Sequence, residues 1–486
     1  MHWRRIMWAA AGVAFSAGCA VGPDYQTPPP PSLTSLTPEP LEHPHGGGRG
    51  GQTFVRNFEI PKRWYELFHC KPLNVITVRA IDGNADLDAA RAAVRVADAN
   101  TEAARGSFFP QIGASLGSSA QQPSAAQAAL SGTNTSPYSL STGQISISFT
   151  PDVFGLTRRQ VESQSAQAES QNFELEAAYL TLTSRIVLAA IQDASLRKQI
   201  ESAQASVTVG REVLELLKKQ LDMREASLTD VATQEAALAQ FEQQLQTLSK
   251  QFGANRDLMI ALTGHLAGEG LPEKFDFSCF QLPRDLPLSL PSKIVRNRPD
   301  IRAAEASMHA ATADIGVAIA NRLPQFNLTG NAGANATAIA KIASFSSPLL
   351  FWSLAGSVAA TLFDGMTAYQ KQKAAEAGLD RAAALYRSAV INAFQNIADV
   401  LQAIEADRRL LLAAERGEKA AQLNLEMTRK LLAGGQANVL QVLTAQQQYA
   451  QASSSTAQAR AVRLSDTVLL FQALGGGWNN GPRSEG

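Results

Sequence analysis

The fold is indicated most directly by residues 106–151, GSFFPQIGASLGSSAQQPSAAQAALSGTNTSPYSLSTGQISISFTP, which contain no Asp, Glu, Lys or Arg. Apolar side chains alternate with small or polar ones in two runs, at Ile112, Ala114 and Leu116 and at Ile145, Ile147 and Phe149. A period of two is typical of strands with one apolar and one polar face. A solvent-exposed β-sandwich would also alternate, but a solvated face has no reason to exclude Lys and Glu. The stretch therefore favours strands that cross a membrane.

A second stretch of the same kind spans residues 323–363, in which Lys341 is the only charged residue. Alternation is visible near its two ends, at Phe326 and Leu328 and at Val358, Ala360 and Leu362. Each pair of strands is expected to enclose a loop rich in Ser, Ala, Asn and Gly, over residues 121–140 and 334–353. One chain therefore supplies four strands.

Four strands are too few to cross a membrane alone. Within lipid only helices and closed barrels satisfy their backbone hydrogen bonds, and spanning barrels begin at about eight strands. Two copies would give eight strands around an interior filled by side chains, whereas three copies give twelve and room for water. Cyclic symmetry closes the ring in either case. We expect an α+β membrane protein in which three chains share a twelve-stranded transmembrane β-barrel, with four strands per protomer.

The chain also contains an internal duplication. Groups of residues recur at an offset that stays between 210 and 214 residues. They include Pro110 and Gln111 with Pro324 and Gln325, Gly155 and Thr157 with Gly365 and Thr367, and Leu262 and Gly264 with Leu474 and Gly476. The sequence thus predicts a twofold internal repeat, in which each half has an Ala-rich helix, two strands and two long helices. The Ala-rich helices are expected at about residues 84–106 and 299–321.

The long helices follow from missing prolines and a heptad pattern. No proline occurs in residues 152–271 or 349–481. Apolar residues recur at alternating spacings of four and three, from Leu175 to Leu221 and from Tyr386 to Leu432. This spacing is typical of helices that pack as a coiled coil. A helix over residues 155–223 would measure roughly 100 Å, longer than a bilayer is thick, so it has to stand in water. A cytosolic rod or filament is the alternative, and the strands argue against it.

The N-terminus has the features of an export signal. Arg4 and Arg5 precede a short apolar run, and small residues lead to Gly18 and Cys19. The apolar run is too short to remain as a membrane-spanning helix. Cleavage between Gly18 and Cys19 would resemble bacterial lipoprotein processing, with Cys19 acylated as the new N-terminus. Ordinary signal cleavage beside an incidental cysteine is the alternative.

Two other cysteines, Cys70 and Cys279, lie outside the expected long helices. An exported protein enters an oxidising compartment. A disulfide between them and a pair of free buried thiols are both compatible with the sequence.

No constellation of residues points to chemistry. The 43 basic and 43 acidic residues balance, whereas a nucleic-acid binder normally has a basic surplus. The six histidines are scattered, and none pairs with Cys or an acid at the spacing of metal ligands. We therefore expect no enzyme activity, no metal and no cofactor other than covalent lipid on Cys19.

Motifs spread over nearly the whole mature chain carry a family resemblance. They are residues 18–25 (GCAVGPDY), 64–68 (WYELF), 72–74 (PLN), 84–87 (NADL), 298–301 (RPDI), 362–365 (LFDG) and 473–478 (ALGGGW). In combination they resemble the TolC/OprM family of outer-membrane factors, in its lipoprotein branch. Cys70 departs from the family pattern, in which an acidic residue is commoner before Pro-Leu-Asn.

The resemblance implies a homotrimeric channel in the outer membrane, continued by a long periplasmic α-helical coiled-coil barrel. Its partners would be a periplasmic membrane-fusion adaptor and an inner-membrane transporter of the resistance-nodulation-division (RND) type. The chain would be the passive exit duct of a tripartite efflux system. The alternatives are the exit duct of a type I protein secretion system and a lipid-anchored structural coiled-coil protein without a pore.

The resemblance also implies roles for two helical turns at the periplasmic tip. Adaptor docking is implied for Arg224, Ala226, Leu228 and Asp230 and, in the second turn, for Gly434, Gly435 and Leu440. Positions that line the aperture in some members correspond here to Gln441 and Thr444. Because both are neutral, weak cation selectivity is expected. Asp230 either adds a ring of carboxylates or caps a helix N-terminus.

These interpretations divide the chain into six parts. They are a signal peptide (residues 1–18), a lipid-anchored N-terminal segment (19–72), a first efflux repeat (73–264), an equatorial linker (265–290), a second efflux repeat (291–477) and a C-terminal tail (478–486).

Overall fold

The computed structural model describes residues 20–29, 52–56, 58–126, 135–288, 291–339 and 350–478. The described residues form two compact units. The first consists of the described residues within Met1–Pro28, Ala93–Gln171 and Ala304–Tyr386, and the second of those within Pro29–Ala92, Asn172–Ala303 and Arg387–Gly486. Several long helices run through both units.

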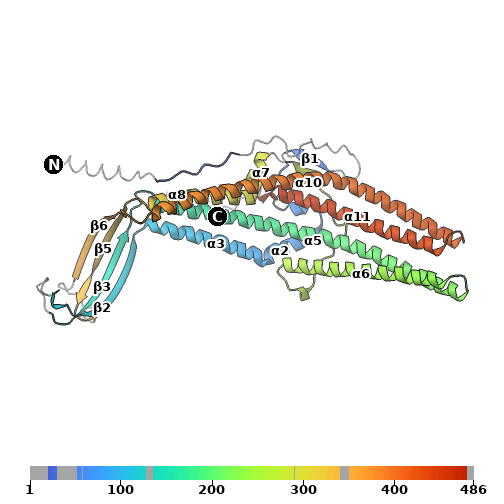
Figure 1. The fold of residues 1–486 in the computed structure, drawn as a ribbon, viewed down its shortest axis with the longest axis horizontal. Coiled ribbons are helices and arrows are strands. Elements are labelled where there is room, and N and C mark those ends of the chain that lie inside the picture. The colour runs from blue at the N-terminus through green and yellow to red at the C-terminus, as the bar shows by residue number, and fades with distance from the viewer. Residues whose placement is uncertain are drawn as a thin grey trace. The chain divides into compact units, whose positions relative to one another are not determined.

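A four-stranded antiparallel sheet belongs to the first unit (Figure 1). Its order is β2 (Gln111–Gln121), β3 (Tyr138–Phe149), β5 (Gln325–Ala336) and β6 (Leu350–Ala359). The prediction of four strands is confirmed. The loops predicted over residues 121–140 and 334–353 are too long, because Tyr138 pairs with Gln121 and Ala334 pairs with Leu350. The predicted second loop therefore took in Leu350, Phe351 and Trp352, which are the first residues of β6.

The helices follow the order expected from the sequence. The Ala-rich helices are α3 (Ala85–Arg105) and α8 (Pro299–Ala320). The long helices are α5 (Leu156–Asp222) and α10 (Thr367–Ala433), with 67 residues each, followed by α6 (Leu228–Leu262) and α11 (Val439–Ala473), with 35 each. None of the helices within the described ranges combines the length and the apolar character needed to span a bilayer.

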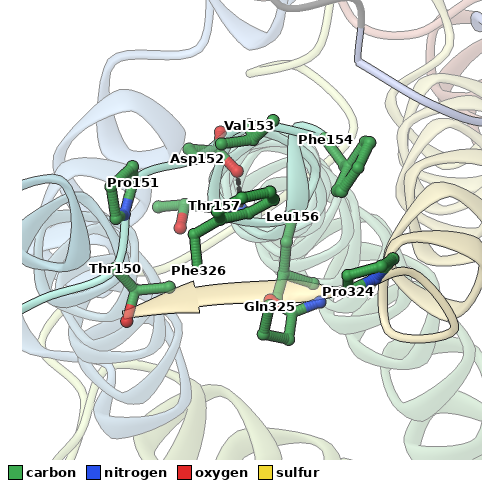
Figure 2. Close-up of a pocket in the computed structure, with 10 residues that line it drawn as sticks. All are labelled: Thr150, Pro151, Asp152, Val153, Phe154, Leu156, Thr157, Pro324, Gln325 and Phe326. Carbon is green, nitrogen blue, oxygen red and sulfur yellow. Dashed lines mark hydrogen bonds between the residues drawn. The ribbon is translucent and has the colours of Figure 1, made fainter. Parts of the chain in front are cut away.

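The passage from β3 into α5 is fixed by Asp152 (Figure 2). Its carboxylate accepts the N–H groups of Thr157 at 2.9 Å and Arg158 at 3.0 Å, so it caps the helix at its first turn. Gly155 precedes the helix with a φ of +81°, a conformation that a side chain would disfavour. A cavity of about 20 Å³, room for one water molecule, lies between this turn and Gln325 and Phe326 of β5.

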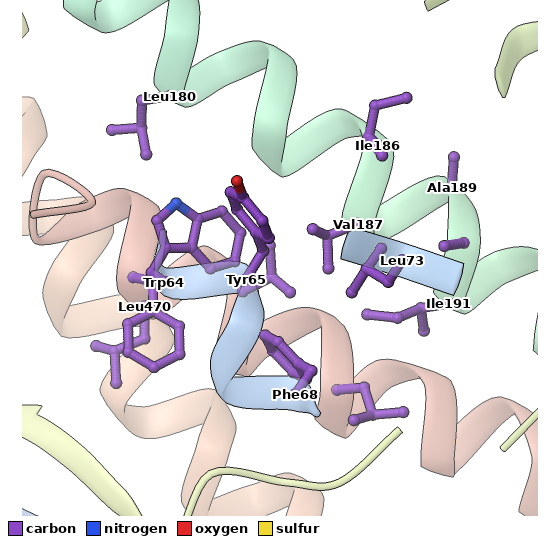
Figure 3. Close-up of a cluster of buried hydrophobic side chains, with 14 of the residues drawn as sticks. Trp64, Tyr65, Phe68, Leu73, Leu180, Ile186, Val187, Ala189, Ile191 and Leu470 are labelled. Carbon is purple, nitrogen blue, oxygen red and sulfur yellow. The ribbon is translucent and has the colours of Figure 1, made fainter. Parts of the chain in front are cut away.

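The second unit is built around an aromatic core (Figure 3). Trp64 and Phe68 of the short 3₁₀ helix η1 (Trp64–Phe68) pack against Phe471 of α11, with centroids of Trp64 and Phe471 5.7 Å apart. Leu73 of α2 (Lys71–Gly83) and Ile186 of α5 are fully buried beside them. Burial of such side chains contributes about 1.5–3 kcal/mol each. This core fixes the N-terminal segment to the long helices.

Smaller elements complete the chain. The strands β1 (Thr53–Arg56) and β4 (Asp285–Leu288) pair in parallel in the second unit. The remaining short helices are η2 (Gly106–Phe108), η3 (Ala267–Glu269) and α7 (Pro291–Asn297). The linker before β4 is held by arginine side chains, since Arg256 donates to the Glu273 carbonyl and Arg197 to the Phe275 carbonyl, each at 3.0 Å.

The long helices use two kinds of interface in the second unit. Helices α5 and α6 pack through apolar side chains, including Leu196 against Leu248 and Leu214 against Val231. Helices α5 and α11 are joined by hydrogen bonds, as between Ser202 and Ser453 at 2.9 Å and between Gln199 and Ser454 at 3.1 Å. Apolar side chains join them as well, since Ile186 of α5 lies in one buried cluster with Val468 and Phe471 of α11.

A buried acid, Asp407 of α10, lies beside the half-buried Asp466 of α11. One carboxylate oxygen of Asp407 is buried without a hydrogen-bond partner among the described residues. Burial, together with a hydrogen bond and charge repulsion from Asp466, raises the pKa of Asp407 to about 7, against an opposing effect of Arg463. The folded chain therefore favours the protonated acid.

This pair predicts a pH-dependent stability. The folded-state pKa of Asp407 exceeds the unfolded value of about 3.9, so the folded state loses stability as the pH rises from about 4 to about 7. Asp407→Asn cannot ionise, and it should raise the unfolding temperature by about 2 °C or more at pH 8 while changing it little at pH 4. Circular dichroism melting measures both. Asp380→Asn, on an exposed part of α10, is the control, and an equal shift at the two pH values would contradict the assignment.

Candidate functional site

Strand register gives the sheet two chemically different faces. One face carries apolar side chains, because Ala114 pairs with Ile145 and Ala332 pairs with both Ile145 and Trp352. The other carries mainly Ser, Thr, Asn, Gln and Gly, as where Asn331 pairs with Ser353, and its larger apolar or aromatic side chains are Tyr138, Leu140 and Phe351. No strand of this sheet contains a charged residue. On the apolar face Ile112 is 72% exposed and Trp352 81% exposed in the single chain.

The sheet also has two open edges. Strands β2 and β6 each pair on one side only within the described residues. They are 11 and 10 residues long and contain neither proline nor charge. Exposed edges of this kind are templates for pairing with another strand, and soluble proteins normally block them. An apolar face with open edges is unsuited to water.

Each hairpin of long helices reverses direction through a similar turn. Ser227 caps α6, since its hydroxyl accepts the Asp230 N–H at 3.2 Å and the Asp230 carboxylate accepts the Ser227 N–H at 2.9 Å. Asn438 and Gln441 form the same reciprocal pair at the start of α11. Such a capping box satisfies two backbone donors that a helix end leaves free. Hydrogen bonds from Ser227 lower the pKa of Asp230.

The ends of the preceding helices require a left-handed residue. Gly435 adopts a φ of +71° after α10, and Arg224 adopts a φ of +60° after α5. Glycine reaches this conformation without steric cost, whereas a side chain such as that of Arg224 makes it unfavourable. The two turns therefore have the same geometry although their sequences differ.

A cavity of about 450 Å³ lies between the two turns. Ala226 and Asp230 line it from the first turn, and Asn438 and Leu440 from the second. The rest of its lining is mixed, with the apolar Leu217, Leu432, Ala437, Val439 and Leu443 beside the polar or charged Gln220, Glu225, Thr233 and Gln234. The structure thus brings together three of the predicted tip residues, while Arg224, Leu228 and Gly434 stay exposed outside the lining.

A model of the family described as outer membrane efflux protein matches residues 77–265 and 290–476. These two segments cover most of the chain. The chain belongs to the outer membrane efflux protein family.

Individual relatives also match over nearly the whole length of the chain. The pyoverdine export outer membrane protein OpmQ of Pseudomonas putida is 26% identical over 457 residues, which are 93% of this chain and 94% of that relative. The cation efflux system protein CusC of Escherichia coli is 24% identical and covers 95% of this chain and 96% of its own. The solved structure of the outer-membrane channel OprN superposes with a TM-score of 0.83 at 25% identity, over 95% of this chain and all of that one.

Family membership confirms the predicted location and role. The efflux protein lies in the outer membrane, extends into the periplasm, and is the exit duct of a tripartite efflux system. Its family forms channels and is not enzymatic. Within the described ranges, no three His, Cys, Asp or Glu side chains come together as a metal site.

The predicted aperture residues of the efflux protein have defined contacts. The side-chain oxygen of Gln441 accepts the Asn438 N–H at 3.0 Å, and the Thr444 hydroxyl donates to the Leu440 carbonyl at 3.0 Å. Both side chains are exposed in the single chain. The contacts of Asp230 give it the capping role, and a ring of carboxylates from several chains stays a prediction. Gly18 and Cys19, the predicted cleavage and lipidation site, lie outside the described residues.

Sequence reasoning missed two polar clusters of the efflux protein. Asp407 and Asp466 occupy one hairpin but are far apart in the chain, so no local motif reveals them. Arg159 lies near the start of α5 and donates to backbone carbonyls of residues 21 and 22. The only signal for the second cluster was the motif at residues 18–25, which was used for the family resemblance and for the lipidation site but not for a contact with α5.

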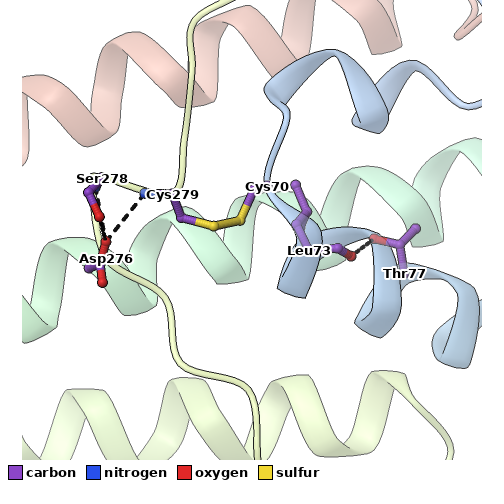
Figure 4. Close-up of a disulfide and its surroundings, with 6 residues drawn as sticks. All are labelled: Cys70, Leu73, Thr77, Asp276, Ser278 and Cys279. Atoms are coloured by element: carbon purple, nitrogen blue, oxygen red, sulfur yellow. Dashed lines mark hydrogen bonds between the residues drawn. A yellow bond between two sulfur atoms is a disulfide. The ribbon is translucent and has the colours of Figure 1, made fainter.

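Cys70 and Cys279 are joined as a disulfide in the structure, with their Cα atoms 5.0 Å apart (Figure 4). Cys70 is fully buried at the N-terminus of α2. The carboxylate of Asp276 accepts the N–H groups of Ser278 at 3.0 Å and Cys279 at 3.3 Å, which holds the turn before Cys279. The arrangement ties the N-terminal segment to the linker.

The proximity of the two cysteines predicts a thiol count. Protein purified from cells, denatured and titrated without reductant should give no free thiol from Cys70 or Cys279, and two after reduction. Cys70→Ser should leave Cys279 as one titratable thiol under both conditions. Two reactive thiols in the unreduced protein would contradict the bond.

Proposed function

We propose that three copies of the chain form one closed twelve-stranded barrel, in which the free edge of β6 pairs with the β2 edge of the next copy. The supporting observation is the two-faced sheet with two open edges. In this arrangement the apolar face meets lipid and the uncharged polar face lines a water-filled lumen. Lipid provides no partners for an open edge, so only closure satisfies the backbone.

The same assembly extends into the periplasm. The helix lengths of 67 and 35 residues occur twice in the same order, which supports a twofold repeat. We propose that the six hairpins of three copies form a coiled-coil barrel whose bore continues the lumen. We further propose the domain limits given above, with residues 1–18 removed and Cys19 acylated at the N-terminus.

The partners are proposed from the family and from the tip. A periplasmic adaptor would dock on the two turns, where exposed Leu228 and Leu440 flank the capped helix ends. An inner-membrane transporter of the RND type would supply the energy. The cargo is proposed to be a small molecule or ion, because OpmQ is named for pyoverdine export and CusC for cation efflux.

A matched pair of substitutions in β3 tests the barrel. Ile145 lies on the apolar face and Gln144 on the polar face. Ile145→Lys exposes an ammonium group to lipid, at a cost of about 2–4 kcal/mol per copy near the midplane, and should abolish membrane insertion. Gln144→Lys should insert normally and shift conductance in planar bilayers toward anions. Equal tolerance of the two changes, or no conductance from the wild-type protein, would contradict the pore.

The proposed aperture predicts weak ion selectivity. Three neutral Gln441 side chains attract cations less than carboxylates would, so the reversal potential in a salt gradient should lie close to that of bulk diffusion. Gln441→Glu keeps an oxygen that can accept the Asn438 N–H and should make the channel clearly cation-selective. Gln447→Glu, an exposed position six residues further along α11, is the control. Unchanged selectivity in Gln441→Glu would place the aperture elsewhere.

A further inference from the structure

The segment after the proposed acylation site is held by the folded protein. Ala20, the first described residue, lies against Gly155, where an added Cβ would come within 2.6 Å of the Ala20 Cα. The Val21 N–H donates to the Phe154 carbonyl at 3.1 Å. All of these residues belong to the first unit. The segment therefore contacts the turn that leads from β3 into α5.

Arg159 of α5 supplies most of the polar contacts. Its side chain is only 5% exposed, and it donates to the carbonyls of Val21 at 3.1 Å and Gly22 at 3.4 Å. It also donates to the carboxylates of Asp24 and Glu162, at 2.7 Å each. A buried guanidinium that binds backbone carbonyls of a distant segment is costly to leave unpaired.

Two glycines allow the segment to lie on α8. Gly22 has a φ of +97°, and a Cβ added to it would come within 2.5 Å of the Gly316 Cα. A Cβ added to Gly316 would come within 2.9 Å of the Val21 carbonyl oxygen. Any side chain at either position forces the two backbones apart. These two glycines, 294 positions apart in sequence, therefore allow the N-terminal segment to lie directly on the backbone of α8.

Tyr25 makes the contacts at the C-terminal end of the segment of residues 20–25. Its ring stacks on that of His309 of α8, with centroids 4.4 Å apart and planes inclined by 21°. The His309 ring lies 3.0 Å from the Glu162 carboxylate, which Arg159 also contacts. The residues that hold the segment are therefore linked to one another across α5 and α8.

The magnitudes identify the important contacts. The Asp24 side chain is 90% exposed, and exposed ion pairs contribute about 0–1 kcal/mol. The important contacts are therefore the buried hydrogen bonds from Arg159 to the backbone carbonyls and the close approach at Gly22. A terminal segment that was not bound to the protein would make neither. We propose that the adjoining surfaces of α5 and α8 are a binding site for residues 20–25, a clamp that fixes where the N-terminus leaves the protein.

The clamp has a consequence for membrane attachment, which rests on the proposed acylation of Cys19. The clamped segment begins beside Gly155, at the border between the sheet and the long helices. Lipid on the preceding residue would be held at that border rather than ranging over the length of a flexible tether. The clamp itself does not depend on the lipid.

Limited proteolysis of the full-length purified protein tests the clamp. Chymotrypsin cuts after tyrosine. Cleavage after Tyr25 requires residues 20–25 to detach from α5 and α8, so the cleavage rate follows the fraction of molecules in which the segment is detached. We expect slow cleavage of the wild type. Gly22→Ala and Arg159→Gln should each cleave at least about tenfold faster, since losing charged or close-packed contacts shifts the equilibrium by that much.

The controls are Gly106→Ala, where an added Cβ has nothing within 4 Å, and Arg105→Gln, an exposed arginine paired only with Glu102. Both should cleave as the wild type does. An intact C-terminal fragment reports that each variant is folded, and the mass of the N-terminal fragment reports acylation separately. Rapid cleavage of the wild type, or wild-type rates in either Gly22→Ala or Arg159→Gln, would overturn the clamp.

Discussion

The efflux protein depends on how the backbone of its four-stranded sheet is hydrogen-bonded. A strand in the hydrocarbon region of a membrane has no water to bind its N–H and C=O groups, and each unsatisfied group costs several kcal/mol. Within one chain β3 and β5 are satisfied on both sides, whereas β2 and β6 are not. The proposed trimer follows from these unpaired backbone groups of β2 and β6. The exposed apolar face places the sheet in lipid, where water cannot satisfy them.

The helical part answers a different requirement, since it has to span an aqueous space. Apolar contacts hold α5 to α6 and α10 to α11, so each hairpin is a stable unit. Between hairpins, Ser and Gln side chains bond across α5 and α11. Apolar side chains of α5 and α11, including Ile186 and Phe471, also share one buried cluster, so both kinds of contact hold the two hairpins together.

The sequence predicted what is periodic and local. Alternation located the four strands, and the missing prolines and heptads located α5 to within one residue at each end. The heptad seam from Tyr386 to Leu432 lies within α10, and Asp230 lies in the first turn of α6, where capping was one of its two predicted roles. Loop limits were wrong, because the first residues of β3 and β6, from Tyr138 and Leu350 on, were assigned to loops although they pair with the neighbouring strands. Contacts between segments far apart in the chain could not be predicted from the sequence. The pairing of Asp407 with Asp466, and that of Arg159 with residues 21–24, exist only once helices are packed together.

The number of chains in the folded channel tests the central claim most directly. Native mass spectrometry of the detergent-extracted protein counts the copies without assuming a shape. We expect three copies per particle, because three sets of four strands enclose a lumen that holds water. A folded particle with a single copy would contradict it, since that particle would leave the edges of β2 and β6 unpaired.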